Sequence, residues 1–558
     1  MLESDVLISN VLQIAQTRPE RVFVKLLFAD GTSVTISYGE LLTNAGRYAA
    51  LYRARQIGQG DVIVIILNHG ADLLYAFVGA LLHGAIPSIF AHPSIKISAQ
   101  EYARTLSLLL NGCGTRFLLT QDGLLASLSQ ENVTLQGIEF MRAGDQQNYD
   151  PVVDPLCFDP AQIVLLQHSS GTTGLKKGVA LSNRSVICQL RNYAEMLLLR
   201  DTDKIVSWLP LYHDMGLVAC FILPMATAIP AVLMSPFDWI ANPIMLLRAI
   251  DENRCSLCWM PNFAYNFLST RIENSASDGL DLSSMRAFIN CAEPIRVASH
   301  HLFYERFKQN GVRWESLCTC YAMAENTFAV TQGGINQPVQ TERVEAKALR
   351  EEGKAILVGD KGQGGQFVVC SGEPIPNTRI RIIDESGGEL PERAIGEIII
   401  QSDSLFSRYH RRSDLTAQAI VNGWYHTGDL GYLANGNLFV VGRKKDLIII
   451  AGKNVYPEDI EEIVSSVDGV HPGRVVALGV YDEKIGTEEL VILAESNREN
   501  ATPPVVVKLA IAKAVREQLE CVANEIVLLP PMWLLKSSSG KISRSANREK
   551  YLQEQRTA

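Results

Sequence analysis

The sequence predicts an α/β protein of several units: a large N-terminal domain of two doubly wound α/β subdomains and a β-rich subdomain, followed by a small α+β C-terminal domain. Three observations support this prediction. The chain has 558 residues, far more than one hydrophobic core usually holds. Helix-like and strand-like apolar patterns alternate up to about residue 330. From about residue 366 to residue 443 strand-like runs dominate.

The first α/β unit lies between residues 6 and 119. Apolar residues recur at helical spacing over 38–55 and 73–82, which predicts two helices. Short apolar runs at 34–36 and 62–66 predict strands between and beside them. This alternation favours a largely parallel sheet.

A second α/β unit begins near Ile163 with a short buried strand over 163–166. Further strands are predicted at 205–209, at 257–260, at 287–290 and in a run that ends near Cys320. Polar or small residues follow the last three of these strands. Ligands bind at such strand ends in open α/β sheets, so we expect the three strand ends to share one crevice.

The β-rich subdomain is predicted over about 366–443. Its strands are expected at 368–370, 380–383 and 398–400. A polar, charge-rich segment at 332–365 precedes it, with helical spacing around Val344 to Arg350. We therefore assign residues 1–443 to the N-terminal domain.

The C-terminal domain is predicted over 444–558. Three adjacent cations, Arg443, Lys444 and Lys445, are unsuited to a strand interior and indicate a hinge at this boundary. Strands are expected at 475–480 and 490–494, and a helix from about Val505 to Leu519.

Composition excludes several classes of protein. The net charge of −9 and the pI near 5.7 argue against broad nucleic-acid binding. The eleven cysteines include one C-x-x-C pair, Cys255 and Cys258, but no second pair completes a zinc pattern. The most hydrophobic window, 73–90, contains His83 and Pro87 and suits a core helix and strand better than a membrane span. The N-terminus lacks a signal peptide, so we expect a cytoplasmic protein that is not an integral membrane protein.

The loop at 169–178, SSGTTGLKKG, is the strongest candidate for binding an anion. Its glycines allow close approach of the backbone to a phosphate, its hydroxyls and N–H groups donate hydrogen bonds, and its lysines supply positive charge. The common P-loop pattern cannot be aligned on it. By itself such a run is more often a polar surface loop, so its interpretation depends on the other motifs.

Five motifs in order give the chain a family resemblance: SSGTTGLKKG, YAMAENT at 321–327, HTGDLGY at 426–432, GRKKD at 442–446 and SSGKISR at 538–544. The chain resembles the adenylate-forming superfamily of acyl-CoA synthetases, luciferases and peptide-synthetase adenylation domains. Within it, LPLYHDMGL, NCAEPIR and KNVYPEDIE are most similar to the segments of fatty acyl-AMP ligases. The interval from Glu325 to Ser371 is longer than is typical of relatives that make CoA esters, and the excess at 332–365 resembles the insertion of the ligases.

The resemblance implies activation of a fatty acid by ATP with Mg²⁺, giving fatty acyl-AMP and pyrophosphate. It further implies transfer of the acyl group to the phosphopantetheine thiol of a separate acyl carrier protein. An acyl-CoA synthetase and a non-catalytic acyl- or nucleotide-binding homologue remain alternatives. An amino-acid-activating domain is disfavoured, because the segments 208–233 and 259–267 are mainly apolar.

The resemblance also implies a set of nucleotide-binding residues. The β- and γ-phosphates would be held by Ser169, Ser170, Gly171, Thr172, Thr173, Gly174 and Lys177. Mg²⁺ would be bound by Thr172 or Thr173 together with Glu325, since this hard cation takes oxygen ligands. The adenine pocket would comprise Asn290, Cys291, Ala292, Glu293, Tyr321, Ala322, Met323 and Ala324. In the family, glycine is usual at the position of Cys291, and threonine is frequent at that of Ala324.

Five further roles follow from the resemblance. Asp429 would bind both ribose hydroxyls, and Arg443 the ribose or phosphate. His213 would stand beside the acyl site. Lys541 would bridge the carboxylate and the α-phosphate as the catalytic lysine. Lys445 would be the hinge that swings a mobile C-terminal domain between two arrangements. Five of the predicted site residues also have a simpler interpretation: a turn residue for Asp429, a core residue for His213, a surface carboxylate for Glu325 and solvated cations for Lys541 and Lys445.

Overall fold

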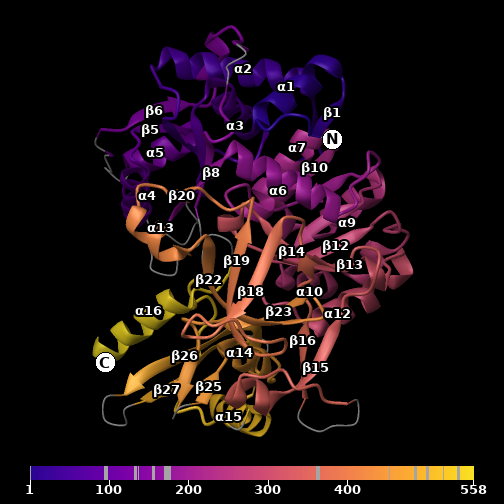
Figure 1. Ribbon diagram of the computed structural model, residues 1–558, viewed down its shortest axis with the longest axis vertical. Helices are drawn as coiled ribbons and strands as arrows, with labels where there is room; N and C mark the ends of the chain where they lie inside the picture. Colours follow the sequence, from indigo (N-terminus) through magenta and orange to yellow (C-terminus); the bar gives the residue numbers. More distant parts are fainter. Residues whose placement is uncertain are drawn as a thin grey trace.

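A nine-stranded mixed sheet is the largest element of the computed structural model, in the order β17-β14-β13-β12-β11-β9-β10-β1-β2 (Figure 1). The structure describes residues 2–92, 99–130, 135, 137–153, 158–168, 177–359, 365–450, 453–482, 487–497, 502–519, 521–536 and 541–557. The strands of this sheet are β1 (Val22–Leu27), β2 (Ser33–Ser37), β9 (Ile205–Ser207), β10 (Ala231–Met234), β11 (Leu257–Met260), β12 (Ala287–Cys291), β13 (Leu317–Ala322), β14 (Ala329–Gly333) and β17 (Glu373–Pro374).

The middle of this sheet confirms the predicted parallel strands. Strand β11 runs parallel to both β9 and β12, and β12 runs parallel to β13. All four strands are buried over most or all of their length, as expected for a parallel sheet covered on both faces. The carboxyl ends of β11, β12 and β13 therefore meet along one edge.

The N-terminal unit has its own parallel sheet, in the order β4-β3-β5-β6. These strands are β3 (Val62–Ile66), β4 (Ile86–Ile89), β5 (Phe117–Thr120) and β6 (Glu139–Arg142). The predicted helices are confirmed as α2 (Tyr38–Ala54), which begins with a capping box between Ser37 and Glu40, and α3 (Ala71–His83). Helix α3 ends at Gly84, whose φ of 78° is a left-handed conformation that favours glycine.

Two details of the predicted subdomains are wrong. Strands β1 and β2 leave the N-terminal unit and extend the large sheet, because β1 pairs in parallel with β10, Val24 lying opposite Ala231. Strand β7 (Ile163–His168) forms an antiparallel sheet with β8 (Gly178–Ser182) and β20 (Arg408–Tyr409) instead of opening a second parallel unit. Alternation along the chain identifies strands but does not say which strands pair.

The remaining helices of this part follow or cross the strands. They are α1 (Leu7–Thr17), α4 (Ala99–Cys113), α5 (Asp122–Gln130), α6 (Asn183–Met196), the π-helix η2 (Met215–Ile222), α7 (Leu223–Thr227), α8 (Pro236–Ala241), α9 (Ile244–Asn253), α10 (Asn262–Arg271), α11 (Asn274–Ser277) and α12 (Val297–Phe307). None of the described helices combines the length and apolarity needed to cross a lipid bilayer.

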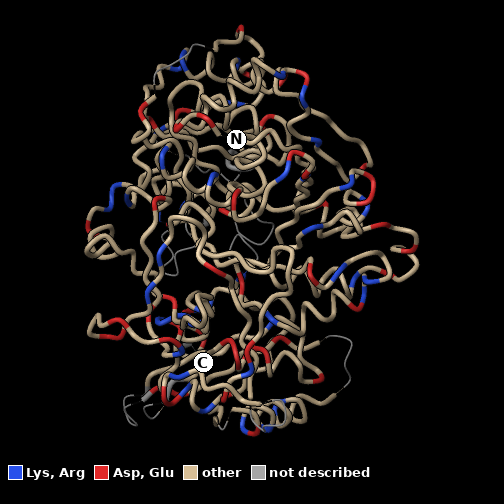
Figure 2. The backbone as a smooth tube through the Cα atoms, turned by 45° about the vertical axis from the view of Figure 1, so that its right-hand side comes forward, with Lys and Arg blue, Asp and Glu red and all other residues tan. Residues whose placement is uncertain are grey.

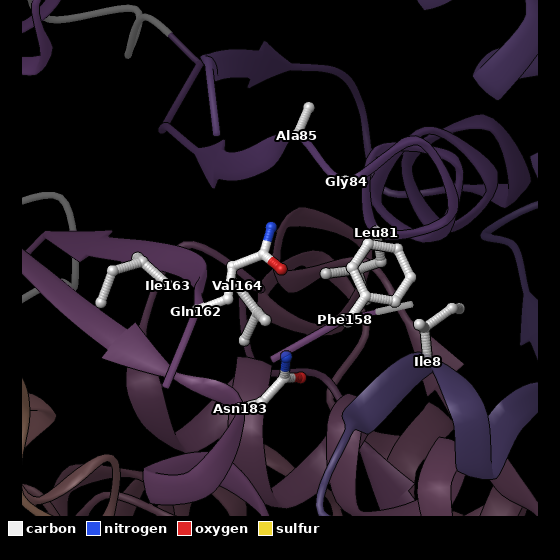
Figure 3. A pocket seen from close by; sticks show the side chains of 9 residues that line it. All are labelled: Ile8, Leu81, Gly84, Ala85, Phe158, Gln162, Ile163, Val164 and Asn183. Atoms are coloured by element: carbon white, nitrogen blue, oxygen red, sulfur yellow. The ribbon is translucent and has the colours of Figure 1, made fainter. Parts of the chain in front are cut away.

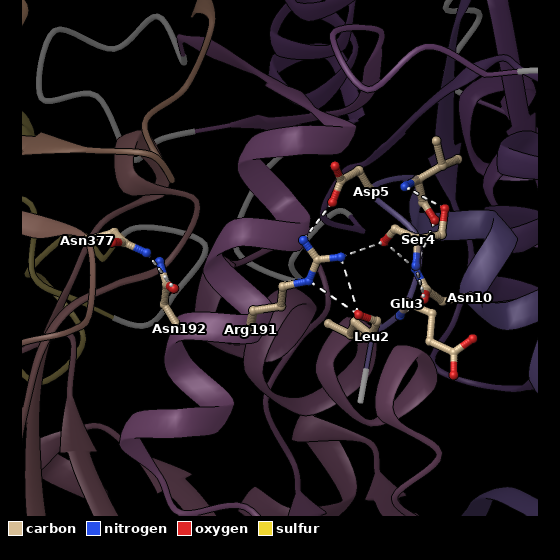
Figure 4. Close-up of polar contacts among 9 residues, drawn as sticks. Leu2, Glu3, Ser4, Asp5, Asn10, Arg191, Asn192 and Asn377 are labelled. Carbon is tan, nitrogen blue, oxygen red and sulfur yellow. Dashed lines mark hydrogen bonds and ion pairs between the residues drawn. The ribbon is translucent and has the colours of Figure 1, made fainter.

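Helix α6 ties the N-terminus to the rest of the chain (Figure 4). Arg191 Nη1 lies 2.6 Å from Asp5 Oδ1, and its other nitrogens donate to the carbonyl oxygens of Leu2 and Ser4. The adjacent Asn192 accepts a hydrogen bond of 3.2 Å from Asn377, which precedes the β-rich sheet. The first residues of the chain are therefore held in place.

The β-rich subdomain is a five-stranded antiparallel sheet of β18 (Thr378–Ile383), β19 (Gly396–Ser402), β21 (Ile420–Val421), β22 (Trp424–Ala434) and β23 (Asn437–Arg443). The segment expected to be helical around Val344 is partly a strand: β15 (Thr341–Glu345) pairs with β16 (Gly365–Val369), and only one π-helical turn, η6 (Ala348–Glu352), follows. Glu342 on β15 accepts two hydrogen bonds from Arg393, at 2.6 and 2.8 Å, and one from Tyr432. These bonds fix the hairpin to the β-rich sheet.

The chain after Arg443 forms a separate group of elements at the opposite end of the molecule from the N-terminus (Figure 1). They are β24 (Ile448–Ile450), β25 (Lys453–Val455), α14 (Pro457–Ser465), β26 (Val470–Asp482), β27 (Thr487–Ser496), α15 (Pro504–Leu519), β28 (Glu525–Leu529) and α16 (Arg544–Thr557). Two apolar clusters here contain residues from position 448 onward and none from earlier in the chain. This group therefore has cores of its own, as predicted. Acidic and basic residues are interspersed over the whole molecule (Figure 2).

Candidate functional site

Asp429 lies on β22 beside the end of β13. Tyr321 donates a hydrogen bond of 2.6 Å to Asp429 Oδ2, and Arg443 Nε lies 3.2 Å from Oδ1. Arg443 is the direct cross-strand neighbour of Asp429 in the β22–β23 pair. The Asp429 carboxylate raises the pKa of the Arg443 guanidinium. Three residues predicted to bind the nucleoside are thus in contact with each other, although the chain separates Tyr321 from the other two by about a hundred residues.

Glu325 lies in a short 3₁₀ turn, η5 (Ala324–Asn326), directly after β13. Tyr409 donates a hydrogen bond of 2.9 Å to Glu325 Oε1. Burial raises the pKa of Glu325, while the bond from Tyr409 and the charge of Lys177 lower it. The residue is 9% exposed, so it is not the ordinary surface carboxylate of the simpler interpretation.

Asp214 lies at the start of η2, where the charge of Lys541 acts on it. Burial raises the pKa of Asp214, and the positive charge of Lys541 opposes this rise. The Asp214 charge in turn raises the pKa of Glu325. His213, the residue before Asp214, is half-buried, with its ring centroid 4.9 Å from that of Tyr212. The lysine of the C-terminal part is therefore near enough to Asp214 for their charges to interact.

Asn290 is fully buried at the end of β12. Its Nδ2 donates to Asn262 Oδ1 and to His300 Nε2, each at 3.0 Å. Burial lowers the pKa of His300 to about 4, so its ring is neutral at pH 7 and can accept this bond. The buried hydrogen bonds of the Asn290 side chain thus stabilise the wall of the predicted adenine pocket.

The other residues of the predicted adenine pocket lie at the same sheet edge. Glu293 Oε2 accepts a hydrogen bond of 2.9 Å from the backbone N–H of Phe263. Ala292 has a φ of 73°, an uncommon conformation for a residue other than glycine. Cys291 and Ala324 are buried, and Ala322 and Met323 are half-buried. Contact of any of these residues with adenine stays a prediction.

Lys445, whose role as a hinge stays a prediction, carries a charge that interacts with several charged residues of the site. Burial lowers its pKa, as does the charge of Arg443, and Asp446 and Asp429 act in the opposite direction. Lys177, near the end of the predicted phosphate loop, also lowers the pKa of Lys445, so the two lysines lie within range of each other's charge. The loop residues themselves, Ser169, Ser170, Gly171, Thr172, Thr173 and Gly174, lie outside the described residues.

No group of three or more histidine, cysteine or acidic side chains suited to a metal occurs in the described parts of the chain. Cys255 and Cys258 are both buried as free thiols. A cation such as Mg²⁺ needs only one or two protein carboxylates when substrate phosphates and water supply its other ligands. Glu325, as one enclosed carboxylate, fits that donor set.

Three residues of the site were missed in the sequence. Asp214 could have been found, because it adjoins His213 in the LPLYHDMGL segment. Arg296 is the last residue of the NCAEPIR segment, and the motif does not show that its side chain contacts helix α14. Tyr409 lies in no recognised motif, and only the pairing of β20 with β8 brings it to Glu325. A small cavity lined by Ile8, Leu81, Phe158 and neighbouring residues contains none of the predicted site residues (Figure 3).

Comparisons with known proteins show which family the chain belongs to. A family model described as AMP-binding enzyme matches residues 12–410. The chain is 29% identical to the long-chain-fatty-acid–AMP ligase FadD26 of Mycobacterium tuberculosis over 528 residues, covering 88% of this chain and 87% of the relative. It is 29% identical to a 4-hydroxyphenylalkanoate adenylyltransferase of the same organism over 529 residues, covering 88% and 82%.

A solved structure from a study of fatty acyl-adenylate ligases of E. coli and L. pneumophila aligns with a TM-score of 0.92 and 27% identity. The alignment covers 100% of this chain and 99% of the other. The fold described above is therefore shared over the full length. On the family match, the motifs and this similarity, the chain belongs to the AMP-binding enzymes of the adenylate-forming superfamily.

Proposed function

We propose that this protein is a fatty acyl-AMP ligase. It activates a fatty acid with ATP, releasing pyrophosphate, and then transfers the acyl group to the phosphopantetheine thiol of an acyl carrier protein. The observation that supports this best is a set of contacts at one site: Tyr321 and Arg443 both contact the Asp429 carboxylate, and Tyr409 contacts both Glu325 and Lys177. These residues come from distant parts of the sequence and form one charged site.

Adenylation brings two anions together, the fatty carboxylate and the α-phosphate. Lys541 would neutralise negative charge that develops between them, in a site where burial strengthens electrostatic interactions. Asp429 would accept hydrogen bonds from the ribose hydroxyls, exchanging its bond from Tyr321 for bonds from the nucleotide. Arg443 remains beside Asp429 and holds its carboxylate in place. His213 would border the carboxylate of the acyl substrate.

Glu325 is the proposed protein ligand of Mg²⁺, with Thr172 or Thr173 assigned by resemblance. The ion would neutralise charge on the phosphates of ATP when bound. Lys177 adds a fixed positive charge next to Glu325, on the side of the predicted phosphate loop. The described residues therefore supply both a carboxylate for the cation and a cation for the phosphates.

The apolar character of the proposed acyl site supports a fatty or aryl-alkyl acid. Trp208 stacks on Trp239 with ring centroids 3.7 Å apart, and Phe263 contacts both rings at its edge. Two of the relatives are named for long-chain fatty acids and for 4-hydroxyphenylalkanoates. Both classes of acid combine an apolar chain with a terminal carboxylate.

The experiment incubates the protein with ATP, Mg²⁺ and radiolabelled acids of increasing chain length, including a 4-hydroxyphenylalkanoate. Each acid is tested alone, with CoA, and with a phosphopantetheinylated carrier protein. We expect acyl-AMP to accumulate with the acid alone, acyl-carrier to form with the carrier, and no acyl-CoA. Efficient formation of acyl-CoA would favour a synthetase instead. Absence of an adenylate with every acid would favour a non-catalytic binding protein.

A further inference from the structure

Tyr409 is joined through its backbone to both parts of the proposed ATP site. It lies on β20, which pairs with β8, the strand that follows the predicted phosphate loop. His410 N–H donates to the carbonyl oxygen of Gly178 at 2.7 Å, and Phe406 N–H donates to that of Glu325 at 2.8 Å. The segment that carries Tyr409 thus ties the end of the loop to the turn that carries Glu325.

The Tyr409 hydroxyl donates a hydrogen bond of 2.9 Å directly to Oε1 of the Glu325 carboxylate. Tyr409 is 2% exposed, and its ring packs 4.7 Å from that of Phe406. The Tyr425 hydroxyl lies 3.4 Å from that of Tyr409. A buried hydroxyl that donates to a buried carboxylate restricts that carboxylate to one orientation.

The side chain of Lys177 lies over the face of the same Tyr409 ring. Its Nζ lies 4.7 Å from the centroid of the Tyr409 ring, within the range of a cation–π interaction. One side chain therefore contacts both the carboxylate proposed for Mg²⁺ and the lysine proposed for the phosphates. A cation bound to Glu325 needs one carboxylate oxygen, and Tyr409 holds the other.

We propose that Tyr409 is a positioning residue that fixes Glu325 for a divalent cation and Lys177 for the phosphates of ATP. This inference rests on the proposed ATP-dependent function of the same site. Tyr409 does not itself touch the reacting atoms.

The test compares wild-type protein with Tyr409→Phe, which removes the hydroxyl and keeps the ring over Lys177. Mn²⁺ affinity is measured by electron paramagnetic resonance in the presence of α,β-methylene-ATP. This analogue cannot transfer its adenylyl group to an acid. We expect Mn²⁺ to bind about tenfold more weakly, because losing a hydrogen bond to a charged group usually changes an affinity by about this factor or more. The Mg²⁺ concentration for half-maximal ATP–pyrophosphate exchange should rise by a similar factor, while KM for the fatty acid stays constant.

Tyr52→Phe is the matched control. Tyr52 is also fully buried, and its hydroxyl donates to the carbonyl oxygen of Ala76 on α3, in the N-terminal unit. Its loss should leave Mn²⁺ affinity unchanged. Tyr409→Leu, a second variant without the hydroxyl, should weaken Mn²⁺ at least as much as Tyr409→Phe.

A double-mutant cycle separates positioning from a general structural role. In a Glu325→Gln background, Tyr409→Phe should no longer change Mn²⁺ affinity, because the group it positions is gone. Equal Mn²⁺ affinity in wild type and Tyr409→Phe, or an equal effect with and without Glu325, overturns the inference. If the protein forms no acyl-AMP yet the cycle gives the expected coupling, only the proposed function fails.

Discussion

Arg296 reaches from the large N-terminal part of the chain to helix α14, where its Nη1 lies 2.5 Å from Glu462 Oε2. Its Nη2 donates to the carbonyl oxygen of Glu458 at 2.9 Å. The backbone of Arg296 is fixed by a buried side chain. Its N–H donates to Asn262 Oδ1, which also accepts a hydrogen bond from Asn290. A polar network therefore runs from the wall of the predicted adenine pocket to the C-terminal elements.

Arg296→Gln should loosen the docking of the C-terminal elements. The variant loses two ion pairs, to Glu462 and Asp459, and the charge that supports the bond to Glu458, so the docked arrangement of the C-terminal elements becomes less populated. We expect several-fold slower ATP–pyrophosphate exchange and faster tryptic cleavage near Lys444. Arg306→Gln, whose bonds stay within its own part of the chain, is the control. Unchanged cleavage and exchange in Arg296→Gln would contradict this role.

Asp459 should make stability depend on pH. Burial raises its pKa from 3.8 to about 6, Arg296 and Arg350 oppose the shift, and Glu458 and Glu462 add to it. Because the folded-state pKa is the higher one, the stabilising effect is full below pH 4 and is lost as the pH rises through 6. The loss amounts to about 3 kcal/mol at most.

Asp459→Asn should remove this dependence. We expect the variant to be more stable than wild type at pH 7.5 and equal to it at pH 4, as measured by urea unfolding of the C-terminal part. The opposite order at pH 7.5 would mean that attraction to Arg296 outweighs the burial of the charge.

Asp429→Asn should weaken ATP binding. The neutral amide accepts poorer hydrogen bonds from ribose and leaves Arg443 without its partner carboxylate. KM for ATP should rise about tenfold with little change in KM for the acid. Asp384→Asn, in an exposed turn, is the control. If KM for ATP is equal in Asp429→Asn and wild type, Asp429 does not bind the ribose and is only a turn residue.

Lys541→Ala should abolish most of the adenylation while sparing nucleotide binding. Removing the charge that stabilises the developing anion should slow acyl-AMP formation by about 10²- to 10³-fold. Lys513→Ala, on the exposed face of α15, should have no effect. Binding of ATP, followed by calorimetry, should change by less than threefold. A full rate in Lys541→Ala would remove the lysine from the mechanism.

The fold could be predicted where local pattern decides structure. The apolar run at 62–66 is β3, the helical period over 38–55 is α2 within one residue, and the run at 257–260 is β11. The pattern failed at Val344, where alternation with buried neighbours in β16 outweighs helical spacing. It also could not place β1 beside β10, because pairing across about two hundred residues leaves no local signal.

The sequence by itself determined the alternating α/β architecture, the β-rich segment, the small C-terminal unit and the motif residues Glu325, Asp429 and Lys541. Only the tertiary structure decided which of these residues meet, and it added Asp214, Tyr409 and Arg296 to the site. The reason is physical: periodicity and turn chemistry act over a few neighbouring residues, whereas ion pairs and buried hydrogen bonds form between segments that only folding brings together.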